Sequence, residues 1–146
     1  MTDGERHPTV VIVGGGFAGL EAARTLARAP VEVVLVDRKN HHLFQPLLYQ
    51  VASAALNPAD IAAPIRHVLA RQQNARVVLG DALAIEPDAR LVRLADGTTL
   101  AYDFLVVAAG ATHSYFGHDA WAPLAPGLKT VEDALEIRRR VLLAIE

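Results

Sequence analysis

Apolar residues in the first forty positions form two continuous runs with a helically spaced segment between them. Residues 10–13 are Val-Val-Ile-Val and lead into glycines, which predicts a strand buried on both faces, as in a parallel sheet. Apolar positions in residues 17–28 recur at helical spacing among charged ones, which predicts an amphipathic helix. Pro30 is expected to end this helix, and residues 31–36 supply a second strand that finishes on Asp37.

The next part of the chain combines an irregular stretch with short elements. Residues 38–60 lose clear periodicity, apart from a possible short helix over 47–51, and this stretch is therefore a natural place for function. Residues 65–69 predict another short helix, which precedes a strand over 76–79.

Three short apolar segments follow, at residues 83–85, 91–94 and 98–102. The dipeptides Pro87-Asp88 and Asp96-Gly97 separate them and predict a small antiparallel β-meander.

The last predicted elements are one strand and one helix. Residues 104–108 are continuously apolar and end at Ala109-Gly110, which predicts a parallel strand that returns to the main sheet. After a proline-rich loop, Thr130 and Asp133 have the spacing of a capping box that opens a helix running through Ile145.

Composition narrows the class of protein. The chain has 146 residues, of which 52% are apolar and 21% charged, and its net charge is −2, so we expect one soluble globular domain that does not bind nucleic acid. The opening MTDGERHP lacks the apolar core of a secretory signal, and no apolar run is long enough to span a membrane, which predicts a cytoplasmic chain. Cysteine is absent, which excludes disulfides, thiolate metal sites and a dithiol relay within these residues.

Gly14, Gly16 and Gly19 form a GxGxxG motif directly after the first predicted strand and at the start of the predicted helix. In this context the first glycine permits a tight turn, the second lets the backbone approach a pyrophosphate, and the third lets the helix pack on the strand. Amides at the helix N-terminus then favour an anion without any basic side chain.

Asp37 lies 18 residues beyond Gly19, at the end of the second predicted strand. A carboxylate there accepts hydrogen bonds from an adenosine ribose and disfavours a 2′-phosphate. The alternative is that the glycines only make a turn and Asp37 only caps a loop, but the order of strand, glycines, helix, strand and acid favours a dinucleotide site. The motif alone does not separate FAD from NAD; the meander favours FAD. The predicted fold is α/β, a Rossmann-like FAD/NAD(P)-binding domain with a parallel sheet and a small antiparallel β-meander.

Two segments carry a resemblance to a known family. Residues 37–52, DRKNHHLFQPLLYQVA, resemble type II NADH dehydrogenases, the single-subunit NADH:quinone oxidoreductases. Residues 105–118 are similar to the second flavin-binding segment of that family, except that Ala109 stands where the family more often has threonine.

The resemblance implies electron transfer from NADH through FAD to a quinone, with no catalytic side chain and no metal in this segment. The predicted FAD-binding residues are Gly14, Gly16, Phe17, Ala18, Gly19, Asp37, Arg38, Asn40, Gln45, Pro46, Ala82, Ala109 and Gly110. The interpretation assigns residues 1–146 to one FAD/NAD(P)-binding domain, the N-terminal and incomplete portion of a longer flavoprotein. In such a parent we expect a second glycine-rich domain for NADH, and C-terminal helices that attach to the cytoplasmic face of the membrane. A homo-oligomer is possible.

Other interpretations stay open. The chain is alternatively a non-catalytic dinucleotide-binding module or part of another FAD-dependent quinone or ferredoxin reductase. Related disulfide reductases place a cysteine pair near residues 45–50, so that mechanism is excluded. Sulfide:quinone oxidoreductases also depend on cysteines and are disfavoured, but they are not excluded, because their cysteines can lie further along a chain. The spacings of His41, His42 and the other histidines match no zinc pattern. Phe44, Leu47 and Leu48 either line the flavin cleft or seal the loop against the core.

Overall fold

The computed structural model describes residues 6–146, which fall into two units interleaved along the chain. The first unit runs up to His42 and resumes at Pro64–Gly110, and the second consists of Leu43–Ala63 and Ala111–Glu146. The first five residues of MTDGERHP lie outside the described part. The assignment of residues 1–146 to one domain remains a prediction.

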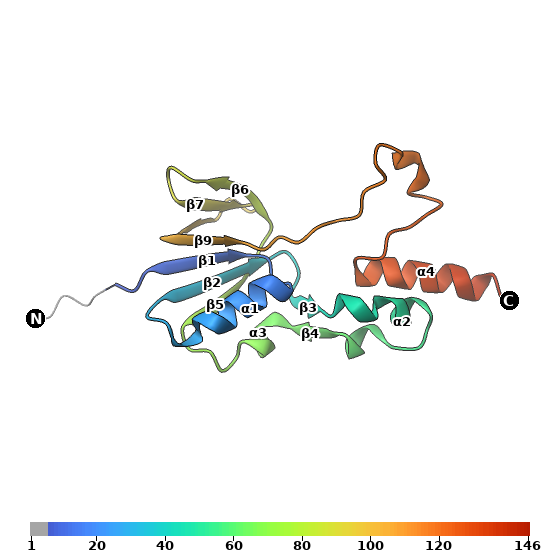
Figure 1. The fold of residues 1–146 in the computed structure, drawn as a ribbon, viewed down its shortest axis with the longest axis horizontal. Helices are drawn as coiled ribbons and strands as arrows, with labels where there is room; N and C mark the ends of the chain where they lie inside the picture. Colours follow the sequence, from blue (N-terminus) through green and yellow to red (C-terminus); the bar gives the residue numbers. More distant parts are fainter. Residues whose placement is uncertain (1–5) are drawn as a thin grey trace, which may run out of the picture. The chain divides into compact units, whose positions relative to one another are not determined.

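A four-stranded parallel sheet forms the centre of the first unit, with strand order β5-β2-β1-β9 (Figure 1). Its strands are β1 (Thr9–Val13), β2 (Glu32–Asp37), β5 (Ala75–Leu79) and β9 (Phe104–Val107). Val10 of β1 pairs with a residue of β2 on one side and of β9 on the other. The predicted strands, including the returning one, are therefore confirmed.

Helices cover one face of this sheet. Helix α1 (Phe17–Thr25) continues into a 3-10 turn, η1 (Leu26–Arg28), and α3 (Ile65–Val68) precedes β5. Both helices pack on Val10 and Ile12, which point to the same side of β1. The helical segment ends two residues before Pro30, as expected from the restricted backbone that precedes a proline.

The predicted meander covers the other face. Its strands β6 (Ala82–Glu86), β7 (Leu91–Leu94) and β8 (Thr99–Ala101) form a three-stranded antiparallel sheet. Residues of β7 and β8 pack against Val11 of β1 and Val34 of β2. Because alternate residues of β1 and β2 face the two layers, these strands need the continuous apolar sequence from which they were predicted.

Strand β9 is largely exposed at its two ends although its sequence is continuously apolar. Phe104 and Val107 are 61% and 62% exposed. The reason is position, since β9 pairs with β1 on one side and ends the order of the described sheet on the other.

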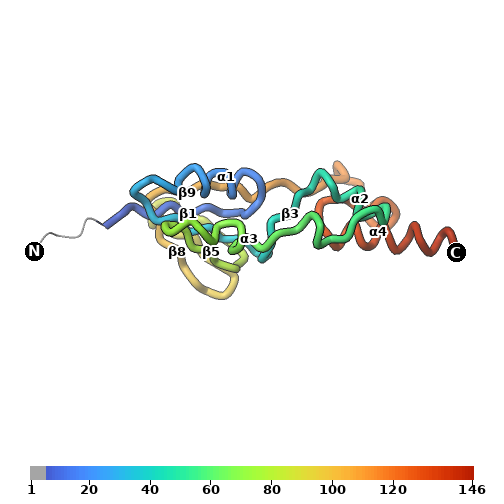
Figure 2. The backbone as a smooth tube through the Cα atoms, turned by 90° about the horizontal axis from the view of Figure 1, so that it is seen from below, coloured from blue at the N-terminus to red at the C-terminus, as the bar shows by residue number. Residues whose placement is uncertain are grey.

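The second unit is mainly helical. A 3-10 turn η2 (Gln45–Leu47) leads into α2 (Leu48–Ala52), which lies beside α4 (Val131–Leu143) in both views (Figures 1 and 2). Two further 3-10 turns are η3 (Pro58–Asp60) and η4 (Asp119–Trp121). The short strands β3 (His41–Leu43) and β4 (Ala62–Pro64) pair with each other.

Leu48, Val51 and Ala134 form the buried core of this unit. Leu48 therefore seals the loop against a core, whereas Phe44 is 44% exposed. The predicted capping box is confirmed: the Thr130 hydroxyl accepts the Asp133 N–H at 3.1 Å, and the Asp133 carboxylate accepts the Thr130 N–H at 2.9 Å. Within residues 6–146, no helix has both the length and the apolar composition needed to cross a bilayer.

Candidate functional site

The glycine-rich turn between β1 and α1 needs its first and third glycines for the fold. Gly14 has a φ of 107°, a region that side-chain-bearing residues rarely adopt, and its N–H donates to the Val36 carbonyl at 2.8 Å. A Cβ at Gly14 would collide with the Ala108 carbonyl oxygen, and one at Gly19 would collide with the Gly14 carbonyl oxygen. These two glycines therefore let β9 and α1 approach the turn.

Gly16 is different, because the fold does not require a glycine there. Its backbone is extended, with φ −73° and ψ −165°, and a Cβ built on it meets no described protein atom within 4 Å. Gly16 is the N-cap residue of α1 and, as a glycine, has no side chain that could cap the helix. The space that a Cβ would fill lies at the helix N-terminus, where amides and the helix dipole attract an anion. We call this open space at the start of α1 the cradle, and its position suits an anion such as a pyrophosphate.

Asp37 ends β2 and touches the turn. One carboxylate oxygen accepts the Gly15 N–H at 2.6 Å and the other accepts the Lys39 N–H at 2.6 Å. Each oxygen of an ionised carboxylate has a second acceptor direction, so the group still has capacity for ribose hydroxyls. The sequence set ribose binding by Asp37 against loop capping as alternatives, and these bonds show that Asp37 does fix the backbone of the turn.

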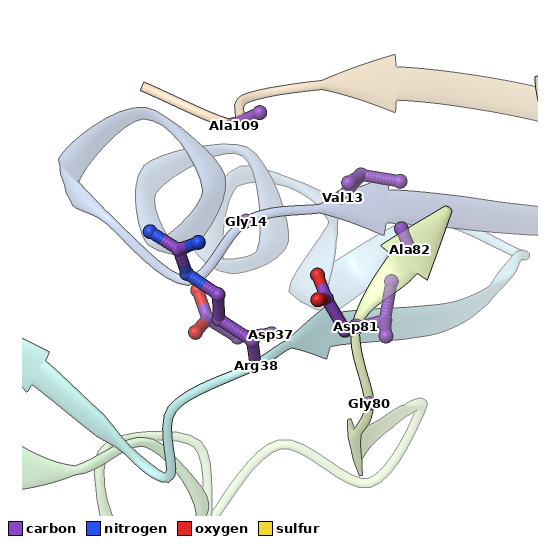
Figure 3. Close-up of a pocket in the computed structure, with 9 residues that line it drawn as sticks. Val13, Gly14, Asp37, Arg38, Gly80, Asp81, Ala82 and Ala109 are labelled. Carbon is purple, nitrogen blue, oxygen red and sulfur yellow. The ribbon is translucent and has the colours of Figure 1, made fainter. Parts of the chain in front are cut away.

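A pocket opens at the carboxyl ends of β1, β2 and β5, all within the first unit (Figure 3). Its lining residues are Val13, Gly14, Val36, Asp37, Arg38, Gly80, Asp81, Ala82 and Ala109. Ligands of open α/β sheets bind at this edge. The cavity measures about 190 Å³, below the roughly 300–1,000 Å³ of a complete small-molecule site, so it suits one part of a dinucleotide.

Several predicted cofactor residues meet at this pocket. Five of them line it directly: Gly14, Asp37, Arg38, Ala82 and Ala109. Gly110 follows Ala109 with a φ of 74° and open space around its Cβ position. Gly16, Phe17, Ala18 and Gly19 lie at the start of α1, after Gly14, and are not among the lining residues.

Three other predicted residues are not among those that line the pocket. Asn40 is exposed, and its carbonyl accepts the Ile65 N–H at 3.2 Å. Gln45 and Pro46 belong to the second unit, where the Gln45 amide donates to the Lys129 carbonyl at 3.4 Å. Their assignment to FAD therefore stays a prediction.

Four lining residues were not predicted from the sequence: Val13, Val36, Gly80 and Asp81. The signal for the last two was present, because Gly80-Asp81 directly follows the strand predicted over 76–79. Carboxyl ends of neighbouring parallel strands share one edge of a sheet, so that dipeptide belongs beside the glycine turn. Asp81 adds a second carboxylate to the pocket (Figure 3). In residues 6–146, no group of three or more histidine, aspartate or glutamate side chains is placed to hold a metal ion.

Sequence comparison identifies relatives over almost the whole chain. The profile of the pyridine nucleotide-disulphide oxidoreductase family matches residues 8–143. The chain is 53% identical, over 98% of its length, to the type II NADH:quinone oxidoreductase NdhA of Mycobacterium tuberculosis. It is 49% identical, over 97% of its length, to the type II NADH:quinone oxidoreductase Ndh of the same organism. The chain spans 31% of the length of each of these two relatives.

Solved structures share the fold. The sulfide:quinone oxidoreductase of Aquifex aeolicus superposes with a TM-score of 0.85 at 26% identity, over 94% of this chain and 32% of that one. NDH2 of Plasmodium falciparum in complex with NADH gives a TM-score of 0.82 at 23% identity, over 91% of this chain and 28% of that one. The predicted architecture is thus confirmed by both the strand order and these neighbours.

Proposed function

Because the chain belongs to the pyridine nucleotide-disulphide oxidoreductase family, we propose that it is the FAD-binding N-terminal portion of a type II NADH:quinone oxidoreductase. The observation that carries the assignment is Gly16, a glycine without a structural reason at the N-terminus of α1. Identity of 53% to a protein named for this activity supports the choice of reaction.

In this proposal the FAD pyrophosphate lies against the start of α1, with Gly16 leaving room for it. Asp37 accepts hydrogen bonds from the ribose hydroxyls, and Ala82 and Ala109 supply pocket walls. Arg38 and Asp81 add charges of opposite sign to the lining of the pocket. Bound FAD would supply the redox chemistry, which is hydride and electron transfer between NADH and a quinone. The residues of this chain bind and orient the cofactor, and none is assigned as a nucleophile or general base.

The parts needed for NADH and quinone are proposed to lie elsewhere in a longer protein. One glycine-rich turn serves one dinucleotide, and a single GxGxxG follows a strand in this sequence. The relatives are about three times as long as the chain, which is consistent with a second dinucleotide domain. Attachment to the cytoplasmic face of the membrane through a C-terminal part, and homo-oligomerisation, belong to the same proposal.

A second candidate is the sulfide:quinone reaction, which the TM-score of 0.85 favours. The higher sequence identity to the NADH:quinone enzymes is the stronger support for the first candidate. The two differ in electron donor, so one assay separates them.

The test uses the purified protein in its natural length. We expect stoichiometric FAD after acid release, and quinone reduction that starts with NADH and does not start with sulfide. Gly16→Ser, prepared alongside, should show little FAD. A preparation that folds but holds no FAD would contradict the proposal, and quinone reduction by sulfide alone would favour the second candidate.

A further inference from the structure

His42 contacts the glycine-rich turn from a part of the chain outside the motif. Its Nδ1 lies 3.1 Å from the Gly15 carbonyl oxygen. A carbonyl oxygen only accepts, so this bond requires the hydrogen on Nδ1. The His42 ring also meets the Phe17 ring edge-on, with centroids 4.9 Å apart and an interplanar angle of 89°. One side chain therefore touches the residues on both sides of Gly16.

Together with Asp37, His42 holds both polar groups of Gly15. The Asp37 carboxylate accepts the Gly15 N–H at 2.6 Å, while His42 donates to the Gly15 carbonyl. In a trans peptide the carbonyl and the following N–H point in opposite directions. Holding the Gly15 carbonyl toward His42 therefore aims the Gly16 N–H away from His42. The orientation of that amide is set by these two side chains rather than by the glycine motif alone.

We infer that His42 is a positioning residue for the dinucleotide pyrophosphate: it acts through Gly15 to orient the amides at the start of α1. The inference rests on the proposed function, because it assumes that the pyrophosphate lies in the cradle that Gly16 leaves open. A glycine-rich turn is flexible when nothing holds it, and preorganised donors bind an anion more tightly than mobile ones. The ring contact with Phe17 restricts the imidazole to the side of the turn.

Two substitutions separate the hydrogen bond from the ring packing. His42→Phe keeps an aromatic ring beside Phe17 and removes the donor. His42→Asn loses the ring but places an amide N–H donor at the same number of bonds from the backbone as Nδ1. His41→Phe is the matched control, because neighbouring residues of a strand point to opposite faces. All variants are compared in the natural-length protein, with circular dichroism melting to establish that each one folds.

The measurements are FAD affinity by fluorescence titration and the phosphorus NMR resonances of bound FAD. Loss of one hydrogen bond predicts FAD binding weakened roughly twofold to tenfold in His42→Phe. Its pyrophosphate resonances should move, His42→Asn should restore most of the affinity, and His41→Phe should match the unmodified protein. Unchanged affinity and resonances in a folded His42→Phe protein would overturn the inference while the proposed function stands. Equal weakening in His42→Phe and His42→Asn would overturn it too, since ring packing would then be the cause. Absence of FAD from the unmodified protein would overturn the proposed function, and the inference with it.

Discussion

Replacing Gly16 by serine should separate the stability of the protein from its affinity for FAD. The backbone at Gly16 suits any residue, and its Cβ would meet no described protein atom within 4 Å. Serine is also a better N-cap than glycine by a few tenths of a kcal/mol, because its oxygen accepts a backbone N–H of the first turn. The FAD-free variant should therefore melt at the same temperature as the parent, or about 1–2 °C higher.

FAD affinity should fall in the same variant. The added Cβ and hydroxyl fill the cradle and compete for the amides that would face the pyrophosphate. Forcing extra atoms into a tight contact costs about 1–3 kcal/mol, which corresponds to a roughly 5- to 150-fold higher Kd. Fluorescence titration of FAD into apoprotein measures the Kd, and thermal melting of the same preparation measures stability.

Gly14→Ala is the contrasting variant. The φ of 107° at Gly14 and the collision of its Cβ with the Ala108 carbonyl should destabilise the protein itself by about 1–3 kcal/mol or more. A Gly16→Ser protein that binds FAD as tightly as the parent would show that the pyrophosphate lies elsewhere. Loss of stability in that variant would show instead that Gly16 has a structural role.

Three further predictions concern Asp37, Glu136 and the isolated chain. Asp37→Ala should weaken FAD binding by an amount on the order of 1.5–3 kcal/mol and also lower the urea midpoint, because the carboxylate holds Gly15 and Lys39; unchanged flavin titration would contradict the ribose assignment. Hydrogen bonds from Arg139 and then Arg140 lower the pKa of Glu136 from 4.5 to about 2. Because this pKa is lowered in the folded state, the ionised Glu136 stabilises the protein above pH 4.5, and this contribution is lost as the pH falls to about 2. The melting temperature of Glu136→Gln should therefore change less with pH over this interval than that of the parent. Identical pH profiles for the two proteins would refute the ion pairs. The 146-residue chain alone should not oxidise NADH with a soluble quinone. Turnover on the order of 10 per second would contradict the proposal that the NADH and quinone sites lie elsewhere in a longer protein.

Much of the fold was predictable because its signals are local. Continuous β-branched runs identified the parallel strands, the Asp96-Gly97 dipeptide identified a hairpin, and Thr130 with Asp133 identified the start of α4. Each of these depends on a few neighbouring residues, and the structure bears each one out.

The rest of the site depends on pairings between distant segments. The sequence placed Asp81 at the end of a strand, but it lines the pocket because β5 pairs with β2 so that Asp37 lies beside Leu79, and no local pattern gives that pairing. His42 lies in a stretch without periodicity, and its contact with Gly15 exists only once β3 and the glycine turn have folded. The exposure of Phe104 likewise follows from the place of β9 in the strand order.

The order of strands in the sheet also determines when each strand can pair during synthesis on the ribosome. Val10 of β1 finds its partner Val33 in β2 early, but its other partner, Phe104, is translated 94 positions later. At about 5–20 residues per second this leaves one edge of β1 unpaired for roughly 5–20 s. Long-range parallel pairing is slow and exposes apolar strands to aggregation while it waits. We therefore expect the nascent chain to need chaperone protection during that interval.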